Sequence, residues 1–333
     1  MAGSRSYADE LIREDVLIDR PWGRLRTIVV RPVDVPGGSG PAVLVCPGRN
    51  AVVEQVTGAE PPDYPDRDVA ARFATAGLAT LTLDYGFDGS IDPERLYGRD
   101  EAAVLAQVYL AAGRSLLAEL VADALAAFGW LRSQPWAGPN AAGLFGHSLG
   151  AAVALHVALS LDRPPPLCTA SHLGSYRILR YGHPALLLPG IARDADLPDL
   201  YAALAPNPLQ VQYGRSDNQL DPADADAAGR RITDVYRLAG AETNAAVRAE
   251  PMGHGTAVTP AIEFFRRTLA GARSTGSSDP TTSTEGDTAK DPGTTLTTGC
   301  ADFPPVRAVV NPSYPTKLQP NQWEVSASGG KSA

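Results

Sequence analysis

The strongest constraint on the fold is an alternation of short apolar runs with longer segments of helical periodicity. The apolar run PAVLVCPG (41–48) is followed by RDVAARFATAG (67–77), which has apolar residues at helical spacing, and the alternation continues to AIEFFRRTLAG (261–271). Continuous apolar strands separated by amphipathic helices are typical of a parallel sheet covered on both faces. Before them, EDVLID (14–19) and RLRTIVVRP (24–32) predict an antiparallel hairpin. The sequence therefore predicts an α/β fold with a mostly parallel, doubly wound sheet and an N-terminal hairpin.

The domain organisation follows from a change of composition near Gly271. Beyond it the chain becomes rich in Ser, Thr, Gly and Pro and poor in large apolar residues. We expect one domain over 1–270 and a disordered low-complexity tail over 271–333. The alternative for the tail is docking on a partner through Val309, Tyr314 or Trp323.

The net charge of the chain indicates which classes of partner it can bind. The formal net charge is -8 and no basic run is present, which argues against nucleic acid or an anionic membrane surface as a partner. No stretch approaches the ~18 apolar residues of a membrane span, and the N-terminus has no apolar signal region. We expect a cytoplasmic protein with a small-molecule substrate, and the sequence does not indicate an oligomeric state.

Lysine and cysteine usage excludes several chemistries. The first lysine is Lys290, so Schiff-base, pyridoxal, Ser-Lys and P-loop chemistry are excluded for the predicted domain. Cys46, Cys168 and Cys300 are far apart and show no metal-ligand spacing, so neither a disulfide framework nor a zinc site is indicated. We expect no cofactor and no metal.

The segment GLFGHSLGAAVAL (143–155) contains the pattern G-x-S-x-G between an apolar run and an Ala-rich helix. In a nucleophile elbow the serine lies on a strained turn between a strand and a helix. The flanking residues must be glycines because a β-carbon would collide at this close approach. The pattern predicts that Ser148 is an exposed nucleophile between Gly146 and Gly150.

An acid and a base follow two later strand ends. Asp217 comes after PLQVQYG (208–214), and His254 comes after NAAVRAE (244–250). In a parallel α/β sheet the carboxyl ends of the strands meet at one edge, where the ligand binds. Ser, Asp and His in this order are typical of the α/β-hydrolase triad, in which the carboxylate orients the imidazole and the imidazole activates the serine.

Other residues compete for these roles. His172 and His183 are alternatives to His254 as the base, whereas His156 lies within the helix after the elbow and is expected to pack in the core. Asp221 is the alternative acid, but it precedes a proline and a helix and is therefore expected to be an N-cap.

The site also needs donors for an oxyanion and a pocket for the substrate. We expect the backbone amide of Leu149 as one donor and that of Arg49 or Asn50 as the other. The segments 86–113 and 172–205 are expected to form a helical lid. The pocket candidates are His147, Tyr176, Arg177 and His183.

From Val16 to Leu269 the chain resembles the α/β-hydrolase superfamily, and within it the dienelactone hydrolase and acetyl xylan esterase-like group. The resemblance is carried by AAGRSLLAELVADALAAFGWLRSQP, by the elbow, by SHLGSYRILRYGHPALLLPGIARDADLPDLYAALAPNPLQVQYGRSD and by MGHG. It implies an α/β-hydrolase fold in which Ser148, Asp217 and His254 are nucleophile, acid and base. Two features depart from the pattern: Pro47-Gly48 stands where His-Gly is usual, and Ala151 replaces a second glycine.

These observations predict a serine hydrolase that cleaves a small carboxylic ester or thioester through an acyl-serine intermediate. The alternative is a biosynthetic acyltransferase or thioesterase-type cyclase that uses the same acyl-serine. A third hypothesis is a protein that binds small molecules without catalytic activity, and the presence of all three triad residues argues against it.

Overall fold

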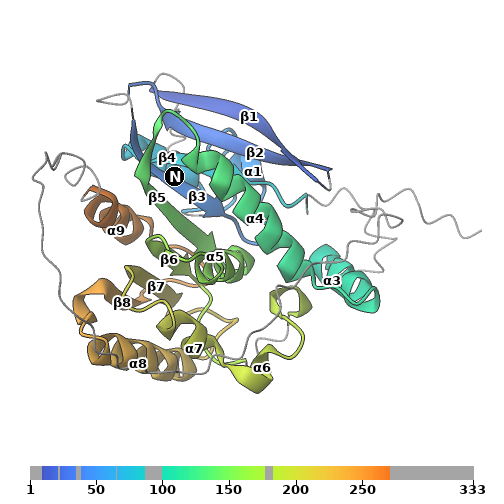
Figure 1. Cartoon of the computed structure of the whole chain (residues 1–333), viewed down its shortest axis with the longest axis vertical. Coiled ribbons are helices and arrows are strands. Elements are labelled where there is room, and N and C mark those ends of the chain that lie inside the picture. The colour runs from blue at the N-terminus through green and yellow to red at the C-terminus, as the bar shows by residue number, and fades with distance from the viewer. Residues whose placement is uncertain are drawn as a thin grey trace, which may run out of the picture. The chain divides into compact units, whose positions relative to one another are not determined.

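The computed structural model describes residues 10–21, 23–34, 39–64, 66–86, 100–176 and 183–270. The predicted tail, 271–333, lies outside these residues, so the domain boundary stays a prediction. Within the described residues, the chain forms one mixed sheet with helices on both sides (Figure 1).

In the described part of the chain the sheet has eight strands, in the order β1-β2-β4-β3-β5-β6-β7-β8. The pairs β1/β2 and β2/β4 are antiparallel, and every pair from β4 to β8 is parallel. This confirms the N-terminal hairpin and the mostly parallel sheet. The strands are β1 (Leu11–Arg20), β2 (Gly23–Pro32), β3 (Gly40–Cys46), β4 (Ala79–Leu83), β5 (Ala137–His147), β6 (Leu167–Ala170), β7 (Leu209–Gly214) and β8 (Ala245–Glu250).

Helices cover both faces of the sheet. On one face lie α2 and α9, and on the other lie α4, α5 and α8, an arrangement that is visible in Figure 1 for α9 against α4 and α5. The α-helices are α1 (Val53–Val56), α2 (Val69–Thr75), α3 (Glu101–Ala111), α4 (Leu116–Arg132), α5 (Leu149–Leu159), α6 (Ile191–Asp194), α7 (Leu197–Ala202), α8 (Pro222–Leu238) and α9 (Val258–Ala270). The described residues also form the short 3-10 helices η2 (Pro184–Leu186) and η3 (Glu242–Asn244).

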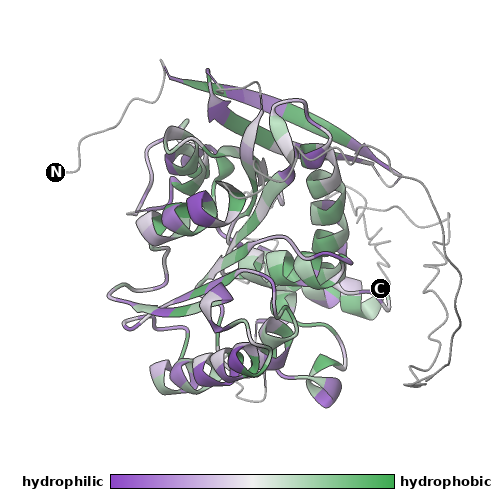
Figure 2. Cartoon of the chain, turned by 60° about the vertical axis from the view of Figure 1, so that its left-hand side comes forward, coloured by the Kyte–Doolittle hydropathy of each residue, from purple (hydrophilic) through white to green (hydrophobic). Residues whose placement is uncertain are grey.

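Burial on both faces explains why the central strands are rich in apolar residues at successive positions. In β3, Val43 and Val45 face the cluster that contains Phe73 of α2 and Phe265 of α9, whereas Leu44 faces the cluster under α4 and α5. Helix α5 is buried and mostly apolar all round, but α8 has a polar outer side, as the mixed colours of the helix at the bottom of Figure 2 show. The hydrophobic pattern of each element therefore follows its depth in the fold.

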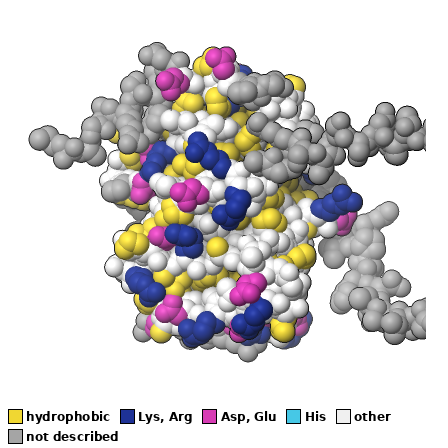
Figure 3. Space-filling model, turned by 90° about the vertical axis from the view of Figure 1, so that its left-hand side faces the viewer, with side chains coloured by type: hydrophobic (Ala, Val, Ile, Leu, Met, Phe, Trp, Pro, Cys, Tyr) yellow, Lys and Arg dark blue, Asp and Glu magenta, His cyan; other side chains and the backbone are white. Residues whose placement is uncertain are grey.

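The surface mixes charges of both signs. On the face shown in Figure 3, basic and acidic side chains lie interspersed. Among the described residues, no single helix is long and apolar enough to cross a membrane. Helices α3 and α4 together have the required length and composition, but they meet at a bend of 102°.

Candidate active site

Ser148 lies on the sharp turn between β5 and α5. Its backbone has φ 54° and ψ -118°, a conformation that L-residues rarely adopt. A β-carbon on Gly146 would lie 2.3 Å from the carbonyl oxygen of Gly150, and one on Gly150 would lie 1.9 Å from the carbonyl oxygen of Cys46. The strain at the serine and the steric need for both glycines are thus as the sequence predicted.

Asp217 lies in the loop after β7, and its side chain is fully buried. Its Oδ1 accepts a hydrogen bond of 2.8 Å from the backbone amide of Gln219. The strand that leads to it ends at Gly214, where a β-carbon would lie 2.2 Å from the carbonyl oxygen of Gly253. This close approach brings the loops after β7 and β8 together, so that Asp217 and His254 become neighbours.

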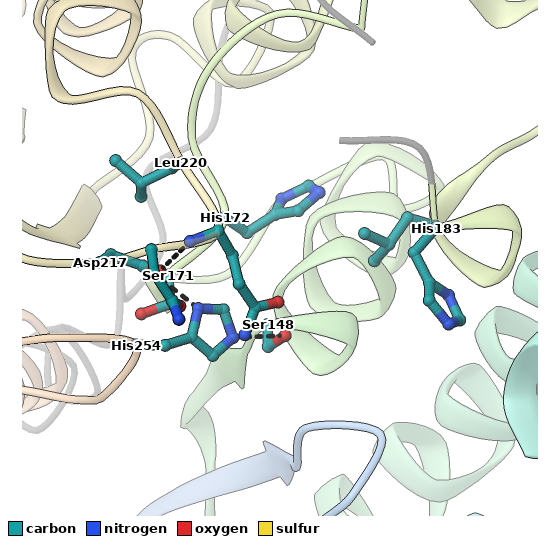
Figure 4. A pocket seen from close by; sticks show the side chains of 10 residues that line it. Ser148, Ser171, His172, His183, Asp217, Leu220 and His254 are labelled. Atoms are coloured by element: carbon teal, nitrogen blue, oxygen red, sulfur yellow. Dashed lines mark hydrogen bonds and ion pairs between the residues drawn. The ribbon is translucent and has the colours of Figure 1, made fainter. Parts of the chain in front are cut away.

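The imidazole of His254 lies between Asp217 and Ser148 (Figure 4). Its Nδ1 is 2.8 Å from Oδ2 of Asp217, and its Nε2 is 2.9 Å from Oγ of Ser148. The carboxylate can only accept, so Nδ1 carries the proton and donates it, and Nε2 accepts from the serine hydroxyl. This is the tautomer in which a histidine can take the proton of a serine.

The expected oxyanion donors belong to two turns, one at the start of α5 and one after β3. Leu149 is the first residue of α5, where intrahelical bonding leaves the amide unpaired. Arg49 and Asn50 form the turn after β3, and neither amide donates to another described residue. Two contacts with other segments hold this turn: Arg49 forms an ion pair with Asp100, and the carbonyl of Asn50 accepts a hydrogen bond of 3.1 Å from Arg67.

A cavity of about 440 Å³ opens over Ser148. Its wall mixes polar and apolar side chains from the loops after β6 and β7 and from the region of η2. Of the two segments predicted as a lid, the second contributes directly to the wall. Besides Ser148, Asp217 and His254, the lining includes Ser171, His172, His183, Leu186, Asn218 and Leu220.

His147, a predicted pocket residue, does not line this cavity as far as the structure describes it. Its ring meets that of His254 edge to face, with centroids 5.1 Å apart, and it lines a smaller cavity with Gly48 and Thr256. Burial, followed by the nearby His254, lowers the pKa of His147 to about 3. The ring of His147 is therefore neutral where it packs against the ring of His254.

The alternative histidines are held in other hydrogen bonds. His172 is buried, its Nδ1 lies 3.2 Å from the hydroxyl of Tyr201, and burial lowers its pKa to about 3. His183 bonds to Asp100 and lies on the other side of Ser148 from His254 in Figure 4. His156 packs in α5 with its Nδ1 2.8 Å from the carbonyl oxygen of Ala152, as expected. Of the histidines considered as a base, the structure brings only His254 within hydrogen-bond distance of Ser148, among the described residues.

The remaining candidates fall elsewhere. Asp221 is the N-cap of α8 and accepts from the amide of Ala223 at 3.0 Å, as predicted. The amide of Tyr176 donates to Asp196 at 2.7 Å, and Tyr176 is not among the described residues that line the cavity. Arg177 lies outside the described residues.

No group of three or more His, Cys, Asp or Glu side chains in the described part of the chain could hold a metal ion. Cys46 and Cys168 are buried free thiols, and burial raises the pKa of both. Cys300 lies in the part that the structure does not describe.

Two polar residues that hold elements of the site were not predicted from the sequence: Asp100, which is half-buried, and Gln212, which is buried. Asp100 joins Arg49, His183 and the N-terminus of α3, and Gln212 of β7 bonds to the loop that carries His254. Asp100 precedes a helix-like segment and could have been recognised as an N-cap. Gln212 is one of two glutamines in the buried strand β7, and a polar residue at a buried strand position was the available signal.

Comparison with known sequences gives a partial match. No family model matches the chain. An uncharacterised protein of Mycobacterium tuberculosis is 38% identical over 133 residues, which are 39% of this chain. The match spans 34% of that relative's length.

Comparison with solved structures identifies the fold. A protein assigned as an acetyl xylan esterase from Bacteroides fragilis superposes with a TM-score of 0.55 at 18% identity, over 72% of this chain and 70% of its own. A protein assigned as a dienelactone hydrolase from Klebsiella pneumoniae gives 0.52 at 15% identity, over 80% of this chain and 100% of its own. A CE15 glucuronoyl esterase from Teredinibacter turnerae gives 0.53 at 18% identity, over 79% and 76%. The fold that the sequence resemblance implied is confirmed.

Proposed function

We propose that this chain, which has the α/β-hydrolase fold, is a serine hydrolase that cleaves a small carboxylic ester or thioester through an acyl-serine intermediate. One observation carries the proposal: the hydrogen-bonded chain from Ser148 through His254 to the buried carboxylate of Asp217. The cavity over Ser148 supplies space for a small substrate.

In the first half of the proposed reaction, Oγ of Ser148 attacks the carbonyl carbon of the ester while Nε2 of His254 takes the hydroxyl proton. The Asp217 carboxylate stabilises the imidazolium through its bond to Nδ1. The negative charge that develops on the carbonyl oxygen is stabilised by the amide of Leu149 and by that of Arg49 or Asn50. The C–O or C–S bond then breaks, and His254 returns the proton to the leaving alcohol or thiol.

In the second half, water attacks the acyl group on Ser148. His254 takes a proton from this water, and the carboxylic acid leaves as Ser148 recovers its hydroxyl proton. The same groups therefore serve as base and acid in both halves, and the proposed cycle needs no further cofactor.

The substrate class is supported by the neighbours of this fold. The three compared structures are named for ester-cleaving enzymes, although their sequence identity to this chain is at most 18%. We therefore propose hydrolysis. No feature of the described residues specifically favours acyl transfer or cyclisation.

A fluorophosphonate probe tests the nucleophile. We expect the parent protein to be labelled at Ser148 and not at Ser171, the other serine of the cavity wall, as mapped by peptide mass spectrometry. Ser148→Ala should lose both the label and turnover of 4-nitrophenyl and thiophenyl acyl esters, while its melting temperature is retained. Labelling elsewhere, or an active alanine variant, would overturn the proposal.

A second measurement tests the intermediate. Intact-mass spectrometry during turnover should show the parent chain enlarged by one acyl group, and the group should disappear as substrate is exhausted. If added alcohols or amines captured most of the acyl group in place of water, the reaction would be acyl transfer.

A further inference from the structure

We propose that Gln212, a buried residue of β7, is a positioning residue for the catalytic base: its side-chain amide clamps the loop that carries His254. The inference rests on the proposed function, because it assigns His254 the role of base. It extends that function to a residue that touches neither the cavity nor the serine.

The contact is a double hydrogen bond to one residue. Nε2 of Gln212 donates to the carbonyl oxygen of Ala257 at 3.0 Å, and Oε1 of Gln212 accepts from the amide of Ala257 at 3.0 Å. Ala257 is the last residue before α9. Gln212 has no exposed surface. Residues 251–257 form the loop that carries His254. Both the donor and the acceptor of the buried Gln212 amide thus bond to the last residue of this loop.

Other contacts hold the rest of this loop. Oγ of Ser171, after β6, donates to the carbonyl of Gly255 at 2.9 Å, and the amide of Ser216 donates to the carbonyl of Met252 at 3.0 Å. Gly214 approaches the carbonyl of Gly253 so closely that no β-carbon fits. His254 therefore lies on a loop tied on both sides to the carboxyl ends of β6 and β7.

The clamp has a chemical reason. A base acts only when its Nε2 is within hydrogen-bond distance of the serine, and a displacement of about 1 Å can cost 10²-fold in rate. Glycines stand on both sides of His254, at 253 and 255, so the backbone of this loop depends on contacts with other elements to hold that position. Loss of the Gln212 amide would leave the backbone N–H of Ala257 without its acceptor, and the carbonyl of Ala257 would keep only the long bond of 3.4 Å from the amide of Ala261.

Gln210 provides a matched control. It lies on the same strand and the same face as Gln212, is 4% exposed, and contacts the same thiol, that of Cys168. Among the described residues it has no bond to the His254 loop. A merely structural role for buried glutamines in β7 would affect both positions alike.

The first experiment compares Gln212→Leu with Gln210→Leu in the full chain. We expect Gln212→Leu to lower kcat and the rate of fluorophosphonate labelling by roughly 10- to 100-fold with a small change in KM, because the base is displaced and the cavity is intact. Gln210→Leu should keep kcat and labelling near the parent values, even where its melting temperature falls as much. Equal losses in both variants, or no loss at Gln212, would overturn the proposal.

The second experiment keeps the shape and changes one donor. Gln212→Glu preserves the volume, but an ionised carboxylate cannot donate to the carbonyl of Ala257, whereas the protonated acid can. Burial raises the pKa of an introduced carboxyl, so protonation is reached at moderately acidic pH. The ratio of kcat/KM between Gln212→Glu and the parent should therefore rise as the pH falls. A folded variant that is impaired by the same factor at every pH would contradict the clamp.

The outcome is separable from that of the proposed function. If Ser148→Ala retains fluorophosphonate labelling, the proposed function fails. If Ser148→Ala loses it but Gln212→Leu behaves as Gln210→Leu does, only the clamp fails.

Discussion

Nε2 of His183 lies 3.1 Å from Oδ1 of Asp100, 83 residues away in the sequence. The other ring nitrogen, Nδ1, accepts a hydrogen bond of 3.2 Å from the amide of Ala185. Because an amide can only donate, Nδ1 is unprotonated and the proton resides on Nε2, which donates to Asp100. Burial, and then the charge of Arg49, lowers the pKa of His183 and favours this neutral form. Both nitrogens are occupied, so His183 is not free to accept the proton of Ser148.

Mutation of His254 and of His183 tests which of the two is the base. We expect His254→Ala to lower kcat by roughly 10³- to 10⁵-fold, because Ser148 loses its base. His183→Gln should cause only a modest loss, since it changes the cavity wall and one contact of Asp100. Steady-state kinetics on one activated ester compare the two variants, and a crippled His183→Gln with an active His254→Ala would reverse the assignment.

The two acids form a second matched pair. Asp217→Asn should lower kcat by about 10⁴-fold, because an amide cannot stabilise the imidazolium and can impose the wrong tautomer. Asp221→Asn should leave both kcat and melting temperature nearly unchanged, since asparagine is as good an N-cap as aspartate. The acid would be misassigned if Asp221→Asn were the inactive variant.

The glycines of the elbow predict a stability difference. Gly150→Ala places a β-carbon 1.9 Å from the carbonyl oxygen of Cys46, so we expect a loss of about 3 kcal/mol or more in the free energy of unfolding. Gly129→Ala in α4 meets nothing within 4 Å and should add up to about 1 kcal/mol through helix propensity. Urea unfolding of both variants checks this, and equal effects at the two positions would contradict the packing at the elbow.

The buried histidines predict a loss of stability in acid. Burial lowers the pKa of His172 from 6.5 to about 3, so between these values the unfolded chain binds more protons than the folded one. The free energy of unfolding therefore falls as the pH is lowered through this window and is fully retained above pH 6.5. His172→Gln, which keeps a polar group beside the hydroxyl of Tyr201, should show a shallower fall of melting temperature between pH 7 and pH 5. Identical slopes for variant and parent would show that His172 is not a source of the effect.

Much of the fold could be predicted from local patterns. The central strands are buried on both faces, so they appear in the sequence as apolar runs. Helices α4 and α8 are buried along one stripe, so their apolar residues recur with a period of 3.6. The turn at Ser148 was predicted for the same reason, since Gly146 and Gly150 mark a close approach that only glycine permits. The N-cap role of Asp221 follows from the residues beside it.

Only the tertiary structure decided which of the candidate side chains meet. The order Ser, Asp, His predicted that the three residues lie at one edge of the sheet. Three histidines could have been the base, and the one that contacts Ser148, His254, is 106 residues away from it in the sequence. That His183 faces Asp100, that His147 packs behind His254 and that Gln212 reaches Ala257 depend on strand order and loop paths. Such contacts join residues from distant segments, and their geometry is set by the packing of the whole sheet rather than by any local pattern.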